Sequence, residues 1–512
     1  MTGPTAETAG AGADADRAVP LCVDLDGTLI RADLLHETAV AVVGHRPATL
    51  LRLPGWWRAG RARLKAELAT RAEAAGFDPA TLPYRAGVLA WLREERAAGR
   101  RLVLATASDR RLAAAVAAHL GLFDDVVASD GSRNLRGAAK AAALRERLGG
   151  PAAGFDYVGD AAPDAEVFAD PGCRRAVLVD PAPGLRAAAA ASGKPLRVFS
   201  AAEADGGRGG RAGGRAGGRE GGLPPVLRLL RPHQWTKNLL LLVPLFVSHR
   251  AGEAELWGPL LLGVAAFSAA ASSVYVFNDL LDMNSDRRHP KKRRRPLAAG
   301  RVGVPAALAT GAGLLVLGLL LAAAAGGAGF LGWVTLYLTL TWAYSLLLKR
   351  RLLVDVLLLA GLYTLRLLAG GALMQITLSP WLLGFGSFMF LSLAFAKRYA
   401  ELARAAATGA AVNPHRGYRA EDLPLLSSAG PACGVAAVLV LSQYVESELS
   451  RAQYADPRFL YLLMPLVLYW ILRVWFFAVR GRLQEDPIAF AMKDAVSYLA
   501  LAVAAGLMLL AR

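Results

Sequence analysis

About nine apolar stretches, each near the length that a membrane-spanning helix needs, follow residue 223. A span takes about 20 predominantly apolar residues, because a helix rises 1.5 Å per residue and the hydrocarbon core is about 30 Å thick. The stretches lie near residues 235–250, 257–280, 305–325, 329–348, 352–375, 380–396, 430–446, 459–479 and 494–511. The C-terminal part of the chain is therefore predicted to be an all-α transmembrane domain of nine helices.

The connections between these stretches alternate in charge. If the N-terminal part is inside the cell, the even-numbered connections are inside too, and the positive-inside bias places most Lys and Arg there. Basic residues do gather in these connections, within 287–295, 349–351, 397–419 and 480–493. This pattern accounts for much of the net charge of +17 without a nucleic-acid partner. We expect a multi-pass protein of the bacterial inner (plasma) membrane, with a cytoplasmic N-terminal domain and its C-terminus outside.

The chain upstream of residue 200 has the pattern of a soluble domain. Short apolar runs such as VPLCVDL and RLVLATAS alternate with helical stretches rich in Ala, Arg and Leu, which is typical of a parallel sheet wound by helices. We expect an α/β domain over residues 19–200 after a disordered N-terminus of residues 1–18. A flexible linker of Gly, Arg and Ala is expected over 201–224, and the membrane domain over 225–512.

A pair of carboxylates follows the first predicted strand. The segment LCVDLDGTLI places Asp24 and Asp26 before a Gly-Thr turn, and at the carboxyl end of a strand such a pair can hold a divalent cation and face a phosphate. Further polar residues follow in order, in LVLATAS, NLRGAAK and YVGDAAPD: Thr106, Lys140, Asp160 and Asp164. This series resembles the haloacid-dehalogenase (HAD) phosphatases.

The resemblance implies a Rossmannoid α/β fold with a helical cap over about residues 31–100, and a role for each motif residue. Asp24 would be the nucleophile that forms an aspartyl-phosphate, and Asp26 the general acid and then base. Thr106 and Lys140 would hold the phosphoryl group, whose anionic oxygens must be neutralised before a carboxylate can attack. Mg²⁺ would be held by Asp24, Asp26, Asp160 and Asp164. The other interpretation is a domain that keeps these residues for folding or metal-dependent stability alone.

The predicted cap contains an aromatic and basic stretch, TLLRLPGWWRAGRARLKAEL. Leu50, Leu51, Trp56 and Trp57 beside several arginines suit the headgroup region of a bilayer. The alternative, which the pattern slightly favours, is a cap core of Leu and Trp with solvated arginines.

A second acidic motif stands at the inner end of the second apolar stretch, in VYVFNDLLDMNSDRRHPKKRRRP. Asp279, Asp282 and Asp286 are spaced i, i+3 and i+7, so in a helix they share one face, with Asn278 at its edge. Stacked carboxylates repel one another unless divalent cations lie between them, and cations held there bind diphosphate. A solvated, charge-balanced helix end is the alternative.

The pattern NDxxDxxxD followed by a basic run resembles the UbiA superfamily of intramembrane prenyltransferases, over about residues 225–512. The resemblance implies that Asn278 and the three aspartates bind Mg²⁺ and a diphosphate. It also implies that basic residues of the following run contact the diphosphate oxygens, namely Lys292, Arg293 and Arg295.

The region after the sixth stretch departs from that family. Members that use aromatic acceptors carry a second aspartate-rich motif there, whereas this chain has FAKRYAELARAA. Lys397, Arg398 and Tyr399 are therefore candidates to meet a phosphate directly, and Glu401 either aids metal binding or pairs with Arg398. Arg366 lies within the fifth stretch, where an arginine is costly, so it is expected to contact substrate or to form an internal ion pair.

Together with RPHQWTKN and YSLLLK, these blocks look most like the branch of the superfamily that makes decaprenyl-phosphate phosphoribose. That resemblance implies transfer of ribose 5-phosphate from phosphoribosyl pyrophosphate to a polyprenyl phosphate, with release of pyrophosphate. Because the acceptor is already an ionised phosphate, no strong general base is needed. Arg366, Lys397 and Arg398 would contact the 5-phosphate or the lipid phosphate.

The two halves together predict a bifunctional enzyme with Mg²⁺ at both sites. The HAD domain would remove the 5-phosphate from the lipid product and leave polyprenylphosphoryl ribose, a glycosyl donor for envelope polysaccharide. One alternative is prenyl transfer from a polyprenyl diphosphate to an aromatic or other lipophilic acceptor, and another is a transporter or channel with a soluble regulatory module. The expected partners are the membrane, a polyprenyl phosphate and phosphoribosyl pyrophosphate, with self-association left open.

Overall fold

The computed structural model describes residues 18–150, 154–207, 223–407, 417–483 and 486–512. Nearly all of the predicted disordered N-terminus and most of the predicted Gly/Arg linker lie outside the described residues. The chain divides into two compact units. The first comprises residues 1–226 together with 279–308, and the second comprises residues 227–278 together with 309–512.

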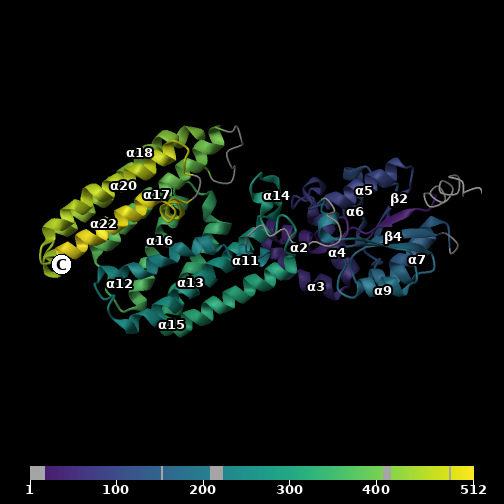
Figure 1. Cartoon of the computed structure of the whole chain (residues 1–512), viewed down its shortest axis with the longest axis horizontal. Helices are drawn as coiled ribbons and strands as arrows, with labels where there is room; N and C mark the ends of the chain where they lie inside the picture. Colours follow the sequence, from purple (N-terminus) through teal and green to yellow (C-terminus); the bar gives the residue numbers. More distant parts are fainter. Residues whose placement is uncertain (1–17, 151–153, 208–222, 408–416, 484–485) are drawn as a thin grey trace, which may run out of the picture. The chain divides into compact units, whose positions relative to one another are not determined.

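A parallel six-stranded sheet forms the centre of the first unit, with its strands in the order β3-β2-β1-β4-β5-β6. The strands are β1 (Leu21–Val23), β2 (Leu102–Asp109), β3 (Asp125–Ser129), β4 (Phe155–Gly159), β5 (Cys173–Val179) and β6 (Leu196–Phe199). Helices cover the sheet (Figure 1), which is why its central strands read as apolar runs without polar alternation. The predicted α/β fold of the N-terminal domain is confirmed.

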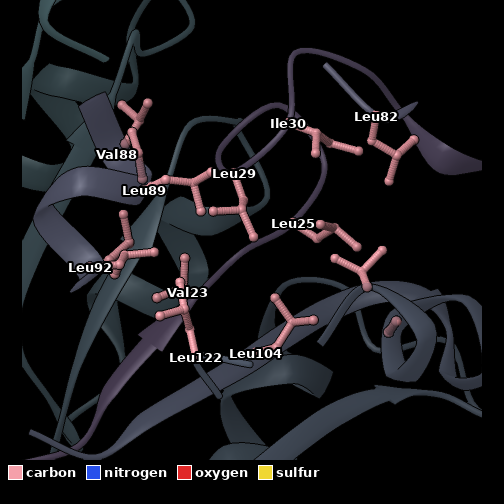
Figure 2. Packing of buried hydrophobic residues seen from close by; sticks show 14 of the residues in the cluster. Val23, Leu25, Leu29, Ile30, Leu82, Val88, Leu89, Leu92, Leu104 and Leu122 are labelled. Atoms are coloured by element: carbon pink, nitrogen blue, oxygen red, sulfur yellow. The ribbon is translucent and has the colours of Figure 1, made fainter. Parts of the chain in front are cut away.

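Two apolar clusters fill the two faces of the sheet. Successive residues of a strand point to opposite faces, so Val23 belongs to one cluster and Cys22 to the other. Figure 2 shows Val23, Leu29 and Leu89 pointing into the same interior. Apart from the helices of an insertion between β1 and α5, the helices of this domain are α5 (Ala86–Ala97), α6 (Arg110–Leu120), α7 (Ala138–Leu148), α8 (Asp164–Ala169), α9 (Leu185–Ala191) and α10 (Ala201–Ala204).

A helical insertion separates β1 from α5. Its elements are α2 (Leu34–His45), η1 (Pro47–Leu51), α3 (Leu53–Arg58), α4 (Arg61–Ala72) and η2 (Pro79–Thr81). Gly60 separates α3 from α4 at φ 107, a backbone conformation that favours glycine. The insertion occupies most of the predicted cap range, whereas α5, at the end of that range, contributes Val88 and Leu92 to the core beside the sheet.

Six helical segments of the described chain are long and apolar enough to cross a membrane. They are α13 (Ala254–Leu281), α15 (Val304–Leu346), α16 (Val354–Leu373), α17 (Pro380–Ala407), the segment Ala420–Glu446 that contains α18 (Leu423–Glu446), and the segment Pro457–Val479 that contains α20 (Leu463–Val479). The prediction that the C-terminal part is a helical membrane domain is confirmed.

The predicted number of nine spans is not confirmed. The third and fourth predicted stretches join in α15, which is interrupted by non-helical dihedral angles at Gly326 and Gly327. The first stretch folds as a 3₁₀ segment, η3 (Pro232–Leu242), followed by the short α12 (Val243–Val247). The last, α22 (Ala495–Ala511), has 17 residues, and about 25 Å of helix falls short of a hydrocarbon core about 30 Å thick.

Helices of the second unit pack in sequence order, α17 on α16 and α18, and α20 on α18 and α22 (Figure 1). Glycines allow α18 and α20 to approach closely. A Cβ atom at Gly430 would lie 1.9 Å from the Trp475 ring, and one at Gly434 would lie 2.6 Å from Ile471. Larger residues at these two positions would force the helices apart.

Candidate active sites

Three neighbouring strands end at the first candidate site. β1 leads into Asp24 and Asp26, β2 contains Thr106, and β4 leads into Asp160. Because β2 and β4 both pair with β1 in parallel, their carboxyl ends meet at one edge of the sheet. The structure thus brings together residues that are far apart in the sequence, as their spacing predicted.

Lys140, in the first turn of α7, lies at the centre of this site. Its Nζ donates hydrogen bonds to Asp24 Oδ1 (2.9 Å) and to the Tyr157 hydroxyl (2.7 Å), and lies 3.4 Å from Asp164 Oδ1. Burial disfavours its charge, but the Asp24 and Asp164 carboxylates raise the pKa of Lys140 above its usual range. A fixed ammonium beside Asp24 can neutralise the oxygens of a phosphoryl group.

An acidic cradle lies next to Lys140. Asp24, Asp160 and Asp164 each offer an oxygen within 4.8 Å of the others, and among the described residues no other group of three His, Cys, Asp or Glu side chains does so. Burial raises the pKa of Asp160 to about 7 and that of Asp24 well above its usual range. A Cβ atom at Gly27 would lie 2.2 Å from Asp160 Oδ2, so glycine keeps the cradle open. Oxygen ligands in this number and charge fit Mg²⁺.

Asp26 lies outside that cradle. Its Oδ1 accepts a hydrogen bond from the Leu34 amide (2.8 Å), and its Oδ2 accepts one from Ser108 Oγ (2.6 Å) and one from Thr106 Oγ1 (3.3 Å). Burial, with the nearby Asp33 charge, raises the pKa of Asp26. A raised pKa and a position outside the cradle suit the predicted general acid better than the predicted metal ligand.

Two residues of this site, Tyr157 and Ser108, were missed by the sequence analysis. Tyr157 donates to Asp164 Oδ1 (2.8 Å) while accepting from Lys140, so it orders both. Ser108 follows Thr106 by two residues on the same strand and could have been found from that spacing. Tyr157 occupies a strand position that is ordinarily apolar, and no pattern marks it.

An open cleft of about 850 Å³ leads to these residues. One wall is the carboxyl edge of the sheet, with Asp24, Asp26 and Lys140, and the opposite wall comes from the helical insertion. The insertion residues that line the cleft include Leu53, Pro54, Trp57, Arg61, Leu64 and Lys65. Basic side chains that line this cleft favour an anionic substrate.

We expect the Lys65→Met variant to raise the KM for a soluble phosphate monoester such as ribose 5-phosphate by about ten- to a hundredfold, because a charged hydrogen bond is worth about 1.5–3 kcal/mol. Lys65 Nζ reaches across the cleft to Asn134 Oδ1 (3.0 Å) and the Ala107 carbonyl (2.5 Å). Arg63→Met, on the same helix but exposed and paired with Glu67, is the matched control and should leave KM unchanged in steady-state phosphate release. Equal KM values for the two variants would remove Lys65 from substrate binding.

The second acidic motif is not one continuous helix. α13 ends at Leu281, and Asp282 is the residue before α14 (Met283–Arg288), with φ −89° and ψ 3°. The predicted common face is therefore interrupted at Asp282, which is half-buried, while Asp279 and Asp286 are buried. The i, i+3, i+7 spacing did not reveal this break in the helix.

Arg295 reaches across this turn. Its Nη1 lies 3.1 Å from Asp279 Oδ1 and 2.5 Å from Asp286 Oδ2, and Lys292 Nζ lies 3.8 Å from Asp286 Oδ1. Asp286 Oδ1 is buried without a hydrogen-bond partner among the described residues. Two buried carboxylates that converge on Arg295, one of them with an oxygen that accepts no hydrogen bond, fit a divalent cation, and the neighbouring basic side chains fit a diphosphate. Arg293, the remaining predicted contact, is exposed.

The acidic motif is tied to the helical insertion within the first unit. Both nitrogens of the Arg287 guanidinium fork contact the Glu37 carboxylate of α2 at 2.8 Å, and both side chains are buried. Arg287 Nε also donates to the Ala298 carbonyl (3.0 Å). A bidentate buried pair is geometrically specific, so it holds the motif and the insertion in one arrangement. The sequence analysis assigned no role to Glu37.

A polar cluster lies inside the second unit, around Asp486. Its carboxylate accepts hydrogen bonds from Lys237 (2.9 Å), Lys397 (3.0 Å) and the Tyr363 hydroxyl (3.1 Å). Lys397 was a predicted site residue, whereas Lys237, in the block RPHQWTKN, and Asp486 were not predicted individually. The three charged residues come from three distant segments, so no local pattern brings them together.

Arg366 of α16 extends this cluster without an ion pair. It donates to Asn238 Oδ1 (2.9 Å), the Leu362 carbonyl (2.6 Å) and the Tyr337 hydroxyl (3.2 Å), and is buried. Within the described residues no carboxylate pairs with it, so the expected internal ion pair is not formed. Neutral partners leave its charge uncompensated, which is the state expected of a residue that meets an anionic ligand. Its substrate contact stays a prediction.

Arg398 forms ion pairs with two carboxylates. Its nitrogens lie 2.5 Å from Asp355 and 2.5 Å from Glu401, and Asp355 also accepts from the Tyr418 hydroxyl (2.7 Å). The pairing of Glu401 with Arg398 is confirmed. Tyr399 instead packs edge-on against Trp475. Consecutive residues of a helix point in different directions, so of the three predicted neighbours only Lys397 contacts Asp486.

Residues 240–500, about half of the chain, match the UbiA prenyltransferase family. The chain belongs to this family. Residues 21–168 match the haloacid dehalogenase-like hydrolases, so this UbiA-family enzyme carries an N-terminal HAD-like domain, and both predicted resemblances are confirmed.

Three relatives show how far the similarity extends. Uncharacterized protein y4nM of Sinorhizobium fredii is 35% identical over 490 residues, covering 94% of this chain and 89% of that protein. Nodulation protein NoeC of Azorhizobium caulinodans is 36% identical over 286 residues, covering 55% of this chain and 91% of that one. Decaprenyl-phosphate phosphoribosyltransferase of Mycobacterium tuberculosis is 36% identical over 200 residues, covering 36% of this chain and 63% of that one. The first relationship extends over both the HAD-like and the UbiA-like parts.

Proposed function

We propose that this UbiA-family chain transfers 5-phosphoribose from phosphoribosyl pyrophosphate to a polyprenyl phosphate, and that its HAD-like domain then removes the 5-phosphate. The final product is polyprenylphosphoryl ribose. We place the HAD-like domain on the cytoplasmic side of the bacterial inner membrane, because the basic connections between apolar segments lie on that side by the positive-inside bias.

The polar cluster around Asp486 carries the proposal. Lys237, Lys397 and Arg366 supply three positive charges against the single carboxylate of Asp486. An excess of buried positive charge is costly unless an anion completes it, and both the ribose 5-phosphate and the polyprenyl phosphate are anionic. The 36% identity over 200 residues to the phosphoribosyltransferase named above supports the same choice.

Transfer needs an acidic site for pyrophosphate and a basic site for phosphate. Asp279 and Asp286, with Asn278 and Asp282 nearby in the sequence, are the residues that would hold Mg²⁺, which offsets the charge of the leaving pyrophosphate. An oxygen of the lipid phosphate attacks C1 of the ribose, and the bond from C1 to pyrophosphate breaks. Because the attacking oxygen is already ionised, no side chain has to remove a proton from it.

Removal of the 5-phosphate uses the cleft of the HAD-like domain. Asp24 attacks phosphorus, the ribose O5 leaves with a proton from Asp26, and Lys140 stabilises the phosphoryl oxygens. Water then attacks the aspartyl-phosphate, with Asp26 accepting its proton, and inorganic phosphate leaves. Ser108 Oγ and Thr106 Oγ1 donate hydrogen bonds to Asp26, which supports its role as the acid and then the base.

The decisive experiment offers the purified protein two donor and acceptor pairs in phospholipid nanodiscs with Mg²⁺. One reaction contains a polyprenyl phosphate and ribose-labelled phosphoribosyl pyrophosphate, and the other contains a polyprenyl diphosphate and an aromatic acid. We expect labelled ribose on the lipid in the first, identified by lipid mass spectrometry, and no prenylated acid in the second. Prenylated acid without ribosylated lipid would instead identify a prenyltransferase of the aromatic-acceptor type.

A further inference from the structure

The helical insertion exposes three large apolar side chains within eight residues. Leu50 is 55% exposed, Leu51 86% and Trp57 66%. They come from η1 and α3, two elements that contact each other. Single exposed apolar residues are ordinary, but a group of this kind marks a surface that another body covers. We call Leu50, Leu51 and Trp57 the insertion face.

Positive charge surrounds the insertion face. Residues 46–61 contain four arginines and no acidic residue, and Arg46, Arg52, Arg58 and Arg61 are all exposed. Within the described residues, no carboxylate forms an ion pair with any of them. Apolar and aromatic residues flanked by unpaired arginines complement the interface of a bilayer that contains anionic lipids.

The insertion lies against the end of a candidate membrane span. A Cβ atom at Gly44, near the end of α2, would lie 3.4 Å from the Leu281 side chain, and Leu281 is the last residue of α13. The buried pair of Glu37 with Arg287 holds this contact in place. η1 begins three residues after Gly44, so along the chain the insertion face starts close to a residue that touches Leu281. The insertion therefore contacts the end of a segment that is long and apolar enough to cross a membrane.

The same segment also forms the wall of the phosphatase cleft. Leu53, Pro54, Trp57 and Arg61 line the cleft opposite Asp24. Trp57 thus belongs both to the insertion face and to the mouth of the cleft. A substrate that slides along this face from the bilayer would bring its phosphate to Asp24.

We propose that the insertion face is seated on the lipid bilayer, and that through it the HAD-like site receives phosphate monoesters carried by lipids. The first half depends only on the surface described above. The second half rests on the proposed function, because it takes the lipid product of the transferase domain as the substrate. Leu50 and Leu51 anchor the face, the arginines bind lipid headgroups, and Trp57 guides the sugar phosphate into the cleft.

The seating is tested by fluorescence in proteoliposomes of phosphatidylethanolamine and phosphatidylglycerol. A Leu51→Cys variant is labelled with an environment-sensitive dye in a Cys433→Ala background, since Cys22 and Cys173 are buried. Glu146→Cys, on the exposed side of α7, is the matched control. We expect nitroxide-bearing lipids to quench the label at position 51 and not at position 146, and aqueous iodide to do the reverse.

Two outcomes would overturn the seating. Quenching of the label at position 51 by iodide would show that the face is in water. Protection from both quenchers would show that a protein surface, such as a second copy of this chain, covers it. Neither measurement depends on catalysis, so the seating is judged even if the proposed reaction is wrong.

The delivery of lipid substrate is tested with the double variant Leu50→Ser and Leu51→Ser, because neither residue lines the cleft. We expect kcat/KM for vesicle-borne polyprenyl phosphoribose 5-phosphate to fall about tenfold, as expected when two leucines lose partial burial in the bilayer. The kcat/KM for soluble ribose 5-phosphate should be unchanged. An equal loss on both substrates would indicate misfolding or a direct effect on the cleft and would overturn delivery through this face. No activity of the wild type on the lipid would reject the proposed function instead.

Discussion

The Asp24→Asn variant should lose at least about a thousandfold in phosphatase rate, as is typical when a catalytic nucleophile is removed, while lipid ribosylation continues. An amide cannot attack phosphorus, but it has the shape of the carboxylate and keeps an oxygen that can accept from Lys140, which lies 2.9 Å away. The lipid product should therefore accumulate with its 5-phosphate in place. Lipid mass spectrometry distinguishes the two products by the mass of one phosphate.

The matched control for this variant is Asp130→Asn, an exposed aspartate in the loop that follows β3. It removes the same charge from the same domain and should leave both activities at wild-type level. Full release of phosphate by Asp24→Asn would rule out an aspartyl-phosphate at this residue. If the variant also stopped ribosylation, the two sites would not be independent, and the proposed order of reactions would need revision.

The Asp279→Asn variant should reduce ribosyl transfer by about a hundredfold or more, since loss of a supporting partner alone costs a metal site ten- to a hundredfold. Asp279 is buried and shares the Arg295 guanidinium with Asp286, so the amide removes one of two converging charges. Phosphate release from soluble ribose 5-phosphate should be unchanged, which tests the folding of the HAD-like domain. Radiolabelled ribose in the lipid fraction measures the transfer.

Glu253→Gln provides the control for that variant, because Glu253 is an exposed acid just before α13, far along the helix from the motif, and pairs only locally with Arg250. Chelation of Mg²⁺ should abolish transfer in the wild type as completely as in Asp279→Asn. Wild-type transfer rates in Asp279→Asn would exclude this acidic motif from the reaction and would favour the Asp486 cluster alone.

The first candidate site could be predicted in detail because its residues follow strands. A parallel sheet brings the carboxyl ends of adjacent strands together, so Asp24, Thr106 and Asp160 had to converge once each was placed after an apolar run. Lys140 was found from the same ordered series. What the pattern missed were supporting residues, because Tyr157 sits within a strand where its hydroxyl has no distinguishing sequence signal.

The second acidic motif shows what residue spacing alone could not predict. An i, i+3, i+7 pattern places three aspartates on one face only if the helix continues, and the chain turns at Asp282. The predicted number of spans was not confirmed for a similar reason. Composition marks the length of an apolar segment, but not the kink at Gly326 and Gly327 or the 3₁₀ geometry of residues 232–242.

The sequence by itself determined the two kinds of domain, the order of the polar residues at the first candidate site and the apolar segments of the membrane part, because these depend on local periodicity and on short motifs that follow strands and helices. Only the tertiary structure decided which charges meet. Arg287 and Glu37 are 250 residues apart, and Lys237 and Asp486 are 249 residues apart. A buried charge needs a partner but leaves no periodic trace of which partner it has, so packing alone makes that choice.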